Sequence, residues 1–158
     1  MKSFLLNLGI AVIWLLLSQE TSAVTFAIGF LIGFVFVAAF RAVLGSEHYV
    51  RNSLAFVRFV LVFMREFLVA NFKVAWTVLA RRPTALHPNF ITYDVAGLTP
   101  FEILLLSYCI SLTPGTTTVQ VSDDFQTLII HALDADAPDA IRADIDRTLK
   151  RGILSFTR

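Results

Sequence analysis

The residue types that build metal and acid–base sites come together between His131 and Asp136. An imidazole with the carboxylates of Asp134 and Asp136 supplies ligands that a divalent metal accepts. If a strand continues through this segment, however, His131 and Asp134 face opposite sides of it, and no partner histidine lies nearby in the sequence. Asp136 also suits the N-cap of a following helix. We therefore predict neither a metal site nor a catalytic residue here.

The segment Thr113-Pro114-Gly115 is a second place to look for a ligand site, because a glycine turn precedes a β-rich run. A phosphate-binding loop, however, needs several glycines and a following lysine. With one glycine and no lysine, the segment predicts no nucleotide or other cofactor. Proline and glycine instead fit the two central positions of a type II turn, with Gly115 at positive φ. The lone Cys109 excludes an internal disulfide and is predicted to lie in the core.

Arg65 and Glu66 have the most unusual surroundings of the ionisable residues, since they lie in the middle of the apolar segment 54–80. At about 100° per residue, both share one helical stripe with Arg58 and Lys73. The opposite side is apolar and carries Phe56, Phe59, Phe63, Phe67 and Val74. In a third membrane span, Arg65 would lie at the bilayer centre at a cost of about 2.5–3.5 kcal/mol. We favour a helix in the membrane interface, with the stripe in water and the other face in lipid or against partner helices.

The composition indicates a membrane protein. Apolar residues make up 56% of the chain and charged residues 16%, against about 25% charged residues in ordinary soluble domains. Two uncharged segments, from Phe4 to Leu17 and from Val24 to Phe40, are joined by the short polar link 18–23. They predict an antiparallel transmembrane helical hairpin. A secretory signal cleaved near Ala23 is the alternative, but another long apolar segment follows at once.

The basic residues predict the orientation of this hairpin. The link 18–23 carries no lysine or arginine, whereas Arg41, Arg51 and Arg58 follow the second segment. The positive-inside bias therefore places both ends of the hairpin in the cytoplasm. An interfacial helix then keeps the C-terminal half in the cytoplasm, with the pair Arg81–Arg82 beside anionic head groups. The formal net charge of +1 gives no reason to expect a nucleic-acid partner.

Gly29 and Gly33 are four residues apart within the second apolar segment. Small residues at this spacing allow two helix backbones to approach closely in a membrane. Glycine is also simply common in membrane helices. We predict a role in helix packing or assembly, with either the first segment or another subunit as the partner.

The chain after residue 83 predicts a small α+β domain of order β-α-β-β-α. Thr99 and Glu102 form a capping box around Pro100, which begins an apolar helix that ends near Leu112. Strands are predicted over 90–95, 116–121 and 126–133, and a final helix, capped by Asp136, has the apolar stripe Ile141, Ile145, Leu149, Ile153 and Phe156. The predicted organisation is a hairpin over 1–46, an amphipathic interfacial helix or third span with a linker over 47–83, and a cytoplasmic domain over 84–158.

Several short motifs follow one another in an order that resembles one family. They are Leu6-Asn7-Leu8, Ala11-Val12-Ile13-Trp14, Phe26-Ala27-Ile28-Gly29-Phe30 with Gly33, Ile110-Ser111-Leu112-Thr113-Pro114-Gly115-Thr116, Ser122-Asp123-Asp124 and Ile130-His131-Ala132-Leu133-Asp134. In this order and over nearly the whole chain, they resemble the E subunit of the Mrp-type multisubunit sodium/proton antiporter, also called Mnh or Sha.

The resemblance implies an accessory, non-catalytic subunit of a bacterial plasma-membrane complex that exchanges Na⁺ for H⁺ in pH and sodium homeostasis. It implies that larger subunits carry the ion pathways, and that the partners of this chain are other membrane subunits and the lipid bilayer. It carries over no catalytic residue, metal or small-molecule cofactor. The alternative from another class is a self-standing membrane-anchored binding domain that recruits a soluble partner. A membrane enzyme is not favoured, because no nucleophile–base pair is evident.

Overall fold

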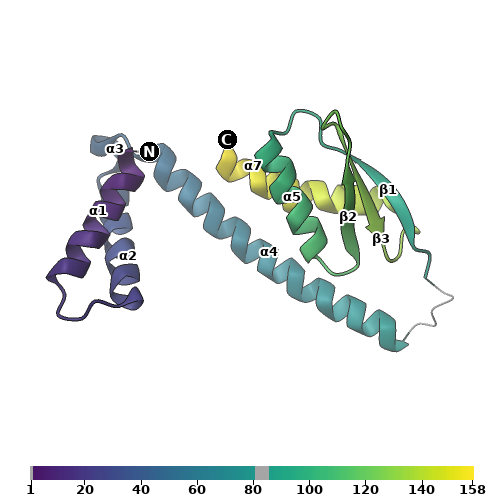
Figure 1. Cartoon of the computed structure of the whole chain (residues 1–158), viewed down its shortest axis with the longest axis horizontal. Coiled ribbons are helices and arrows are strands. Elements are labelled where there is room, and N and C mark those ends of the chain that lie inside the picture. The colour runs from purple at the N-terminus through teal and green to yellow at the C-terminus, as the bar shows by residue number, and fades with distance from the viewer. Residues whose placement is uncertain (1, 81–85) are drawn as a thin grey trace. The chain divides into compact units, whose positions relative to one another are not determined.

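The computed structural model describes residues 2–80 and 86–158, which form two compact units (Figure 1). The first unit runs to Leu54 and the second begins at Ala55. The predicted segment boundary at residue 83 and the basic pair Arg81–Arg82 lie outside the described residues. The division into three functional segments therefore stays a prediction.

The first unit is entirely helical. It contains α1 (Lys2–Leu17), α2 (Ala23–Ala39), α3 (Arg41–Leu44) and the beginning of α4 (Glu47–Ala80). The hydroxyl of Ser22 accepts a hydrogen bond from the N–H of Thr25 at 3.1 Å and so caps α2. Within the described residues, no helix combines the length and the hydropathy needed to cross a membrane. The predicted helical N-terminal part is confirmed, and its transmembrane placement stays a prediction.

A three-stranded antiparallel sheet forms the centre of the second unit. Its strands are β1 (Asn89–Asp94), β2 (Thr116–Val121) and β3 (Thr127–Ala132), in the order β1-β3-β2. Alternate side chains point to one buried face, as strand geometry requires; they are Ile91, Tyr93, Leu128, Ile130 and Ala132. The pairing of β2 with β3 is irregular between Thr118 and Gln120.

The helices that precede and follow the β2–β3 hairpin in the chain cover this face. Helix α5 (Pro100–Leu112) begins with the predicted capping box, in which Thr99 and Glu102 bond each other's backbone N–H. The final helix consists of α6 (Pro138–Asp144), the π-helical turn η2 (Ile145–Lys150) and α7 (Arg151–Thr157). The predicted small α+β domain is thus confirmed. The predicted N-cap is wrong, because Ala137 holds that position without a side-chain bond and the Asp136 carboxylate pairs with His87 at 2.8 Å.

Helix α4 completes the core of this unit. Phe59 is only 6% exposed and belongs to the same core as the sheet and α5, and its ring centroid lies 5.4 Å from that of Phe156 in α7. Phe63 packs against the same core. The prediction that this side of the helix contacts lipid or partner helices is therefore wrong at these residues. Phe59 and Phe63 pack against the sheet and helices of the same chain.

The connection between α5 and β2 is a tight turn. The N–H of Thr116 donates to the carbonyl of Thr113 at 3.2 Å, which places Pro114 and Gly115 at the two central positions. Gly115 has a φ of +96°, in the region that side chains with a Cβ rarely adopt. The turn directs the chain from the covering helix into the edge strand.

Replacing Gly115 tests this turn. We expect Gly115→Val to lower the free energy of unfolding by about 1–3 kcal/mol, because a β-branched residue is strained at positive φ. Gly115→Asn is the matched control and should lose less, since asparagine tolerates this region better. The measurement is the thermal unfolding midpoint of the full chain in detergent, followed by reaction of the buried Cys109 with a fluorogenic thiol reagent. Equal midpoints for valine and asparagine would contradict the assignment.

Candidate functional site

The predicted packing residues Gly29 and Gly33 are both buried, and both lie against α1. A Cβ added to Gly29 would lie 2.8 Å from the Cβ of Trp14. A Cβ added to Gly33 would overlap the Oδ1 of Asn7 and lie 3.1 Å from the Asn7 carbonyl oxygen. Larger side chains at either position therefore require the two helices to separate. Whether this packing serves assembly stays a prediction.

Asn7 belongs to the motif Leu6-Asn7-Leu8, but the sequence predicted no structural role for it. Its side chain is fully buried, and its Nδ2 donates to the hydroxyl of Tyr49 at 2.8 Å. Its Oδ1 has no hydrogen-bond partner among the described residues and fills the space left by Gly33. The hydroxyl of Ser46 also donates to that of Ser3 at 2.9 Å. These bonds join the beginning of α1 to the beginning of α4, and the only signal was one strongly polar residue in an apolar run.

The charged stripe of α4 is mostly exposed. Arg58, Arg65 and Lys73 are exposed, and Arg65 Nη1 lies 3.0 Å from Glu66 Oε1. The two partners differ, since the Arg65 side chain is 76% exposed and that of Glu66 is 27% exposed. Glu66 therefore lies toward the second unit's interior and Arg65 toward its surroundings.

A cavity of about 440 Å³ lies between α4 and the covering helices of the second unit. It brings together two predicted sites, because Glu66 and Lys73 from the stripe and Thr113 and Pro114 from the turn all line it. The rest of the wall is mixed, with apolar side chains such as Ile145 beside the carboxylates of Asp134, Asp136 and Asp144. The remaining members of the predicted sites, Arg58, Arg65 and Gly115, do not line it.

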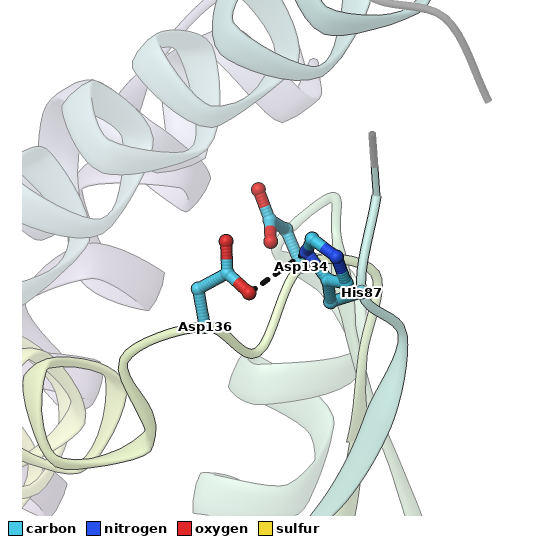
Figure 2. A group of neighbouring side chains, drawn as sticks. All are labelled: His87, Asp134 and Asp136. Atoms are coloured by element: carbon cyan, nitrogen blue, oxygen red, sulfur yellow. Dashed lines mark ion pairs between the residues drawn. The ribbon is translucent and has the colours of Figure 1, made fainter. Parts of the chain in front are cut away.

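His87, Asp134 and Asp136 form a cluster of potential metal ligands, whose ligand atoms all lie within 4.8 Å of one another (Figure 2). No partner histidine lies nearby in the sequence, but the fold brings one to these aspartates. The antiparallel pairing of β1 with β3 brings His87 to the segment that follows β3. Its Nδ1 lies 2.8 Å from Asp136 Oδ1, and its carbonyl accepts the N–H of Ala135 at 3.0 Å. These bonds give the pair a structural role in closing the end of the sheet.

His131, the histidine that the sequence had placed with these aspartates, lies elsewhere. Its ring centroid is 5.2 Å from that of Phe90, in an edge-to-face arrangement. Both residues belong to the strand positions that alternate with the buried ones. His131 is therefore a side chain of the open face of the sheet.

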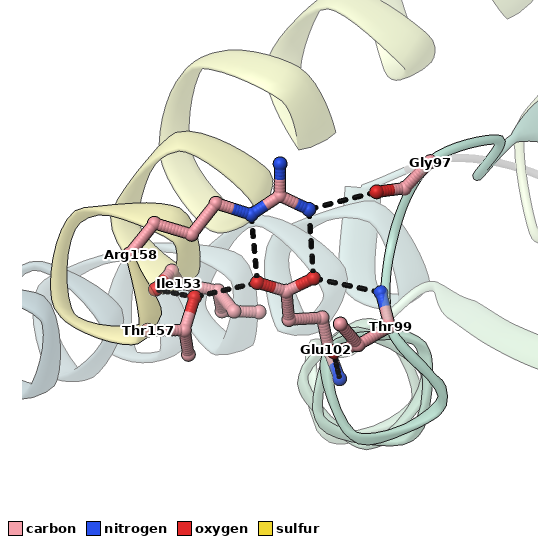
Figure 3. A network of polar contacts seen from close by, with 6 residues as sticks. All are labelled: Gly97, Thr99, Glu102, Ile153, Thr157 and Arg158. Atoms are coloured by element: carbon pink, nitrogen blue, oxygen red, sulfur yellow. Dashed lines mark hydrogen bonds and ion pairs between the residues drawn. The ribbon is translucent and has the colours of Figure 1, made fainter.

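Glu102 is the most buried charged side chain among the described residues, at 2% exposed. Arg158 donates two hydrogen bonds to its carboxylate, from Nε at 3.1 Å and from Nη2 at 2.9 Å (Figure 3). The Thr157 hydroxyl and the Thr99 N–H donate to the same carboxylate at 2.7 and 2.8 Å. The hydrogen bonds from Arg158, followed by those from Thr99 and Thr157, outweigh burial and lower the pKa of Glu102 to about 2. The capping role was predictable, and the partner 56 residues away was not.

Comparison with known proteins places this architecture in a class. A family model described as Na⁺/H⁺ ion antiporter subunit matches residues 7–156. The chain is 34% identical to the E subunit of the Na⁺/H⁺ antiporter of Alkalihalophilus pseudofirmus, covering 98% of this chain and 97% of that protein. It is 29% identical to the corresponding antiporter protein of Bacillus subtilis, with the same coverage of both chains. A chain with this helical hairpin and small α+β domain thus belongs to the class of ion-antiporter subunits. The chain belongs to the MNHE family, the E subunits of the multisubunit Na⁺/H⁺ antiporter, and the predicted resemblance is confirmed.

Two solved membrane complexes contain chains of similar fold. One is the Mrp complex from Dietzia sp. DQ12-45-1b, with a TM-score of 0.50 and 23% identity over 65% of this chain and 94% of that chain. The other is the membrane-bound sulfane sulfur reductase, an archaeal respiratory membrane complex. Its chain has a TM-score of 0.56 and 20% identity over 97% of this chain and 98% of its own length. At these identities, the likeness concerns the fold alone.

The Glu102–Arg158 contact predicts a stability that depends on pH. The folded-state pKa of Glu102, about 2, lies below its ordinary value of 4.5. The carboxylate therefore stabilises the fold fully above about pH 4.5, and this contribution is lost as the pH falls through the folded pKa. We expect Glu102→Gln to lower the free energy of unfolding by about 2–3 kcal/mol at neutral pH. Circular dichroism melts should show that difference shrinking as the pH falls from 5 toward 2.

Asp144→Asn is the control for this prediction, because it removes the exposed ion pair between Asp144 and Arg147. Exposed pairs contribute about 0–1 kcal/mol, so this variant should melt close to the unmodified chain. A Glu102→Gln variant as stable as Asp144→Asn at neutral pH would contradict the importance of the buried contact.

Proposed function

We propose that this chain is an accessory, non-catalytic subunit of a multisubunit Na⁺/H⁺ antiporter in a bacterial plasma membrane. It supports assembly and activity of the complex in pH and sodium homeostasis, and other subunits carry the ion pathway. The family match over residues 7–156 is the observation that carries this proposal. The two hairpin helices support it, because the segments 3–17 and 23–39 contain no Asp, Glu, Lys or Arg that would serve an ion.

The proposal includes a bilayer location for the α1–α2 hairpin. The outward side chains of these helices support it, since Leu5, Leu31 and Val35 are 58%, 63% and 66% exposed. The 17 residues of α2 extend about 26 Å, slightly less than a hydrocarbon core of about 30 Å. A bilayer accommodates a short hydrophobic stretch by local thinning. Both ends of the hairpin and the sheet domain are then cytoplasmic, by the positive-inside bias.

The partners in this proposal are other membrane subunits and the lipid bilayer, without nucleic acid or a small-molecule cofactor. Helix α5 supports contact with another subunit through an outward apolar row. Its residues Phe101, Leu104, Tyr108 and Leu112 are between 52% and 62% exposed. The same row also fits the alternative of a self-standing membrane-anchored domain that recruits a soluble partner. Purification distinguishes the two.

A tagged chain purified from its native membrane in mild detergent should bring several polytopic membrane proteins with it. We expect Gly33→Leu to lose these partners and the antiport activity, because the added side chain forces α1 away from α2 at Asn7. Gly9→Leu is the matched control, since a Cβ there meets nothing within 4 Å in this chain. Recovery of a single soluble partner instead of membrane proteins would favour the alternative function. Intact complexes with Gly33→Leu would contradict the packing role.

Cysteine labelling tests the proposed topology. In a Cys109→Ala background, Glu20→Cys places a thiol in the link between α1 and α2, and Asp139→Cys places one on the sheet domain, where the side chain is 97% exposed. A membrane-impermeant thiol reagent added to intact cells should label Glu20→Cys at once. It should label Asp139→Cys only after permeabilisation. Labelling of Asp139→Cys in intact cells would make α4 a third span and contradict the cytoplasmic domain.

A further inference from the structure

Helix α4 has a second apolar side that the second unit does not cover. Five large side chains on it are strongly exposed, and we call them the outer face: Val57 (53%), Leu61 (65%), Leu68 (56%), Phe72 (76%) and Leu79 (83%). At 100° per residue they fall within an arc of about 60°. The centre of this arc lies about 180° from the buried Phe59–Phe63 side. The helix is therefore apolar on two opposite sides, of which the core takes one.

The flank of the outer face is basic and aromatic. On the same helical projection Arg58, Arg65 and Trp76 lie about 50–70° from its centre. Trp76 is 72% exposed, and the Arg65 side chain is 76% exposed. Glu66, the acid nearest in sequence, lies on the other side of the helix and lines the cavity. The outer face thus combines bulky apolar side chains with arginine and tryptophan and carries no acid.

This combination fits one kind of surroundings better than others. Arginine guanidinium groups at the edge of an apolar face reach lipid phosphates while their stems stay on the apolar surface. Tryptophan sits favourably at the level of the head groups, and phenylalanine and leucine form the lipid-facing side of helices that lie in the interface. A close-packed partner helix in a membrane would instead favour small residues such as those of α2. The outer face is bulky throughout.

We propose that the outer face of α4 lies on the anionic surface of the cytoplasmic leaflet, with Arg58 and Arg65 against lipid phosphates. The inference rests on the proposed membrane location and adds which side of the helix meets lipid. The side is opposite to the one that hydropathy alone indicated, because the phenylalanine side is occupied by the core. In this arrangement α4 holds the sheet domain at the membrane surface.

Two neighbouring residues allow a matched test. Leu68 belongs to the outer face, whereas Phe67 lies next to Phe63, with ring centroids 6.4 Å apart. In a Trp14→Phe, Trp76→Phe background, Leu68→Trp and Phe67→Trp each leave one tryptophan in the full chain. The variants are reconstituted into phosphatidylglycerol-containing vesicles whose acyl chains are brominated either near the head group or near the chain end. Low reactivity of Cys109 toward thiol reagents verifies that each variant is folded.

We expect bromine near the head group to quench Leu68→Trp more than bromine near the chain end, and neither to quench Phe67→Trp strongly. Exchanging phosphatidylglycerol for phosphatidylcholine should reduce the quenching of Leu68→Trp. The added changes Arg58→Gln and Arg65→Gln should reduce it in the same way. These three results together support the proposal.

Other results overturn it. If bromine does not quench Leu68→Trp, the outer face does not contact lipid and this inference is wrong. The proposed antiporter role would be unaffected, because co-purification tests it separately. Stronger quenching from the chain end would mean that α4 crosses the bilayer, which overturns both this inference and the proposed topology. Quenching that ignores head-group charge and both arginines would overturn the anionic contact. A photo-crosslinking residue at position 68 that joins another subunit in the intact complex would show that protein covers this face.

Discussion

The contact between Phe59 and helix α7 determines how every other side of α4 is used. The ring occupies space where α7 has no side chain, since a Cβ at Gly152 would lie 3.2 Å from Phe59 Cε2 and closer still to Cδ2. Full burial of a phenylalanine stabilises a fold by about 1.5–3 kcal/mol relative to exposure. Rotation of α4 about its axis would give up this burial, and it would bring Arg58 or Arg65 toward an apolar core. The helix therefore keeps one orientation relative to the sheet, with Glu66 toward the cavity and Leu68 outward.

The first unit depends on close backbone approach in the same way. Gly33 leaves room for the amide of Asn7, and that amide reaches Tyr49 at the beginning of α4. A buried amide oxygen with no partner among the described residues is costly in apolar surroundings, and the bond from the same amide to Tyr49 offsets part of that cost. This hydrogen bond, like that between Ser46 and Ser3, ties the hairpin to the start of α4. A larger residue at position 33 would disturb this contact as well as the packing of α1 on α2.

The features that the sequence predicted well are those set by neighbouring residues. Thr99, Pro100 and Glu102 fix the start of α5 within four positions, and Pro114-Gly115 fixes its end. The errors all concern partners that are distant in the chain. His87 meets Asp136 only because β1 pairs with β3, and Glu102 meets Arg158 only because α7 packs beside α5. The local sequence also suited Asp136 to an N-cap. Its ion pair with His87, a residue distant in the chain, takes it out of that role. Helical periodicity likewise identified both sides of α4 as distinct without indicating that the phenylalanine side would meet the chain's own core.

The buried ionisable groups of the second unit bear on the division of labour in the proposed complex. A proton pathway needs groups that exchange protons near neutral pH. Arg158 holds the pKa of Glu102 at about 2, so this carboxylate stays charged. Burial raises the pKa of Cys109 to about 11, and burial together with the hydrogen bond to Asp146 raises the pKa of Tyr93 well above its usual range, so both stay protonated. Each of these groups is fixed in one protonation state by the contact that stabilises the fold. In the proposed complex, these three groups would contribute packing and no proton transfer.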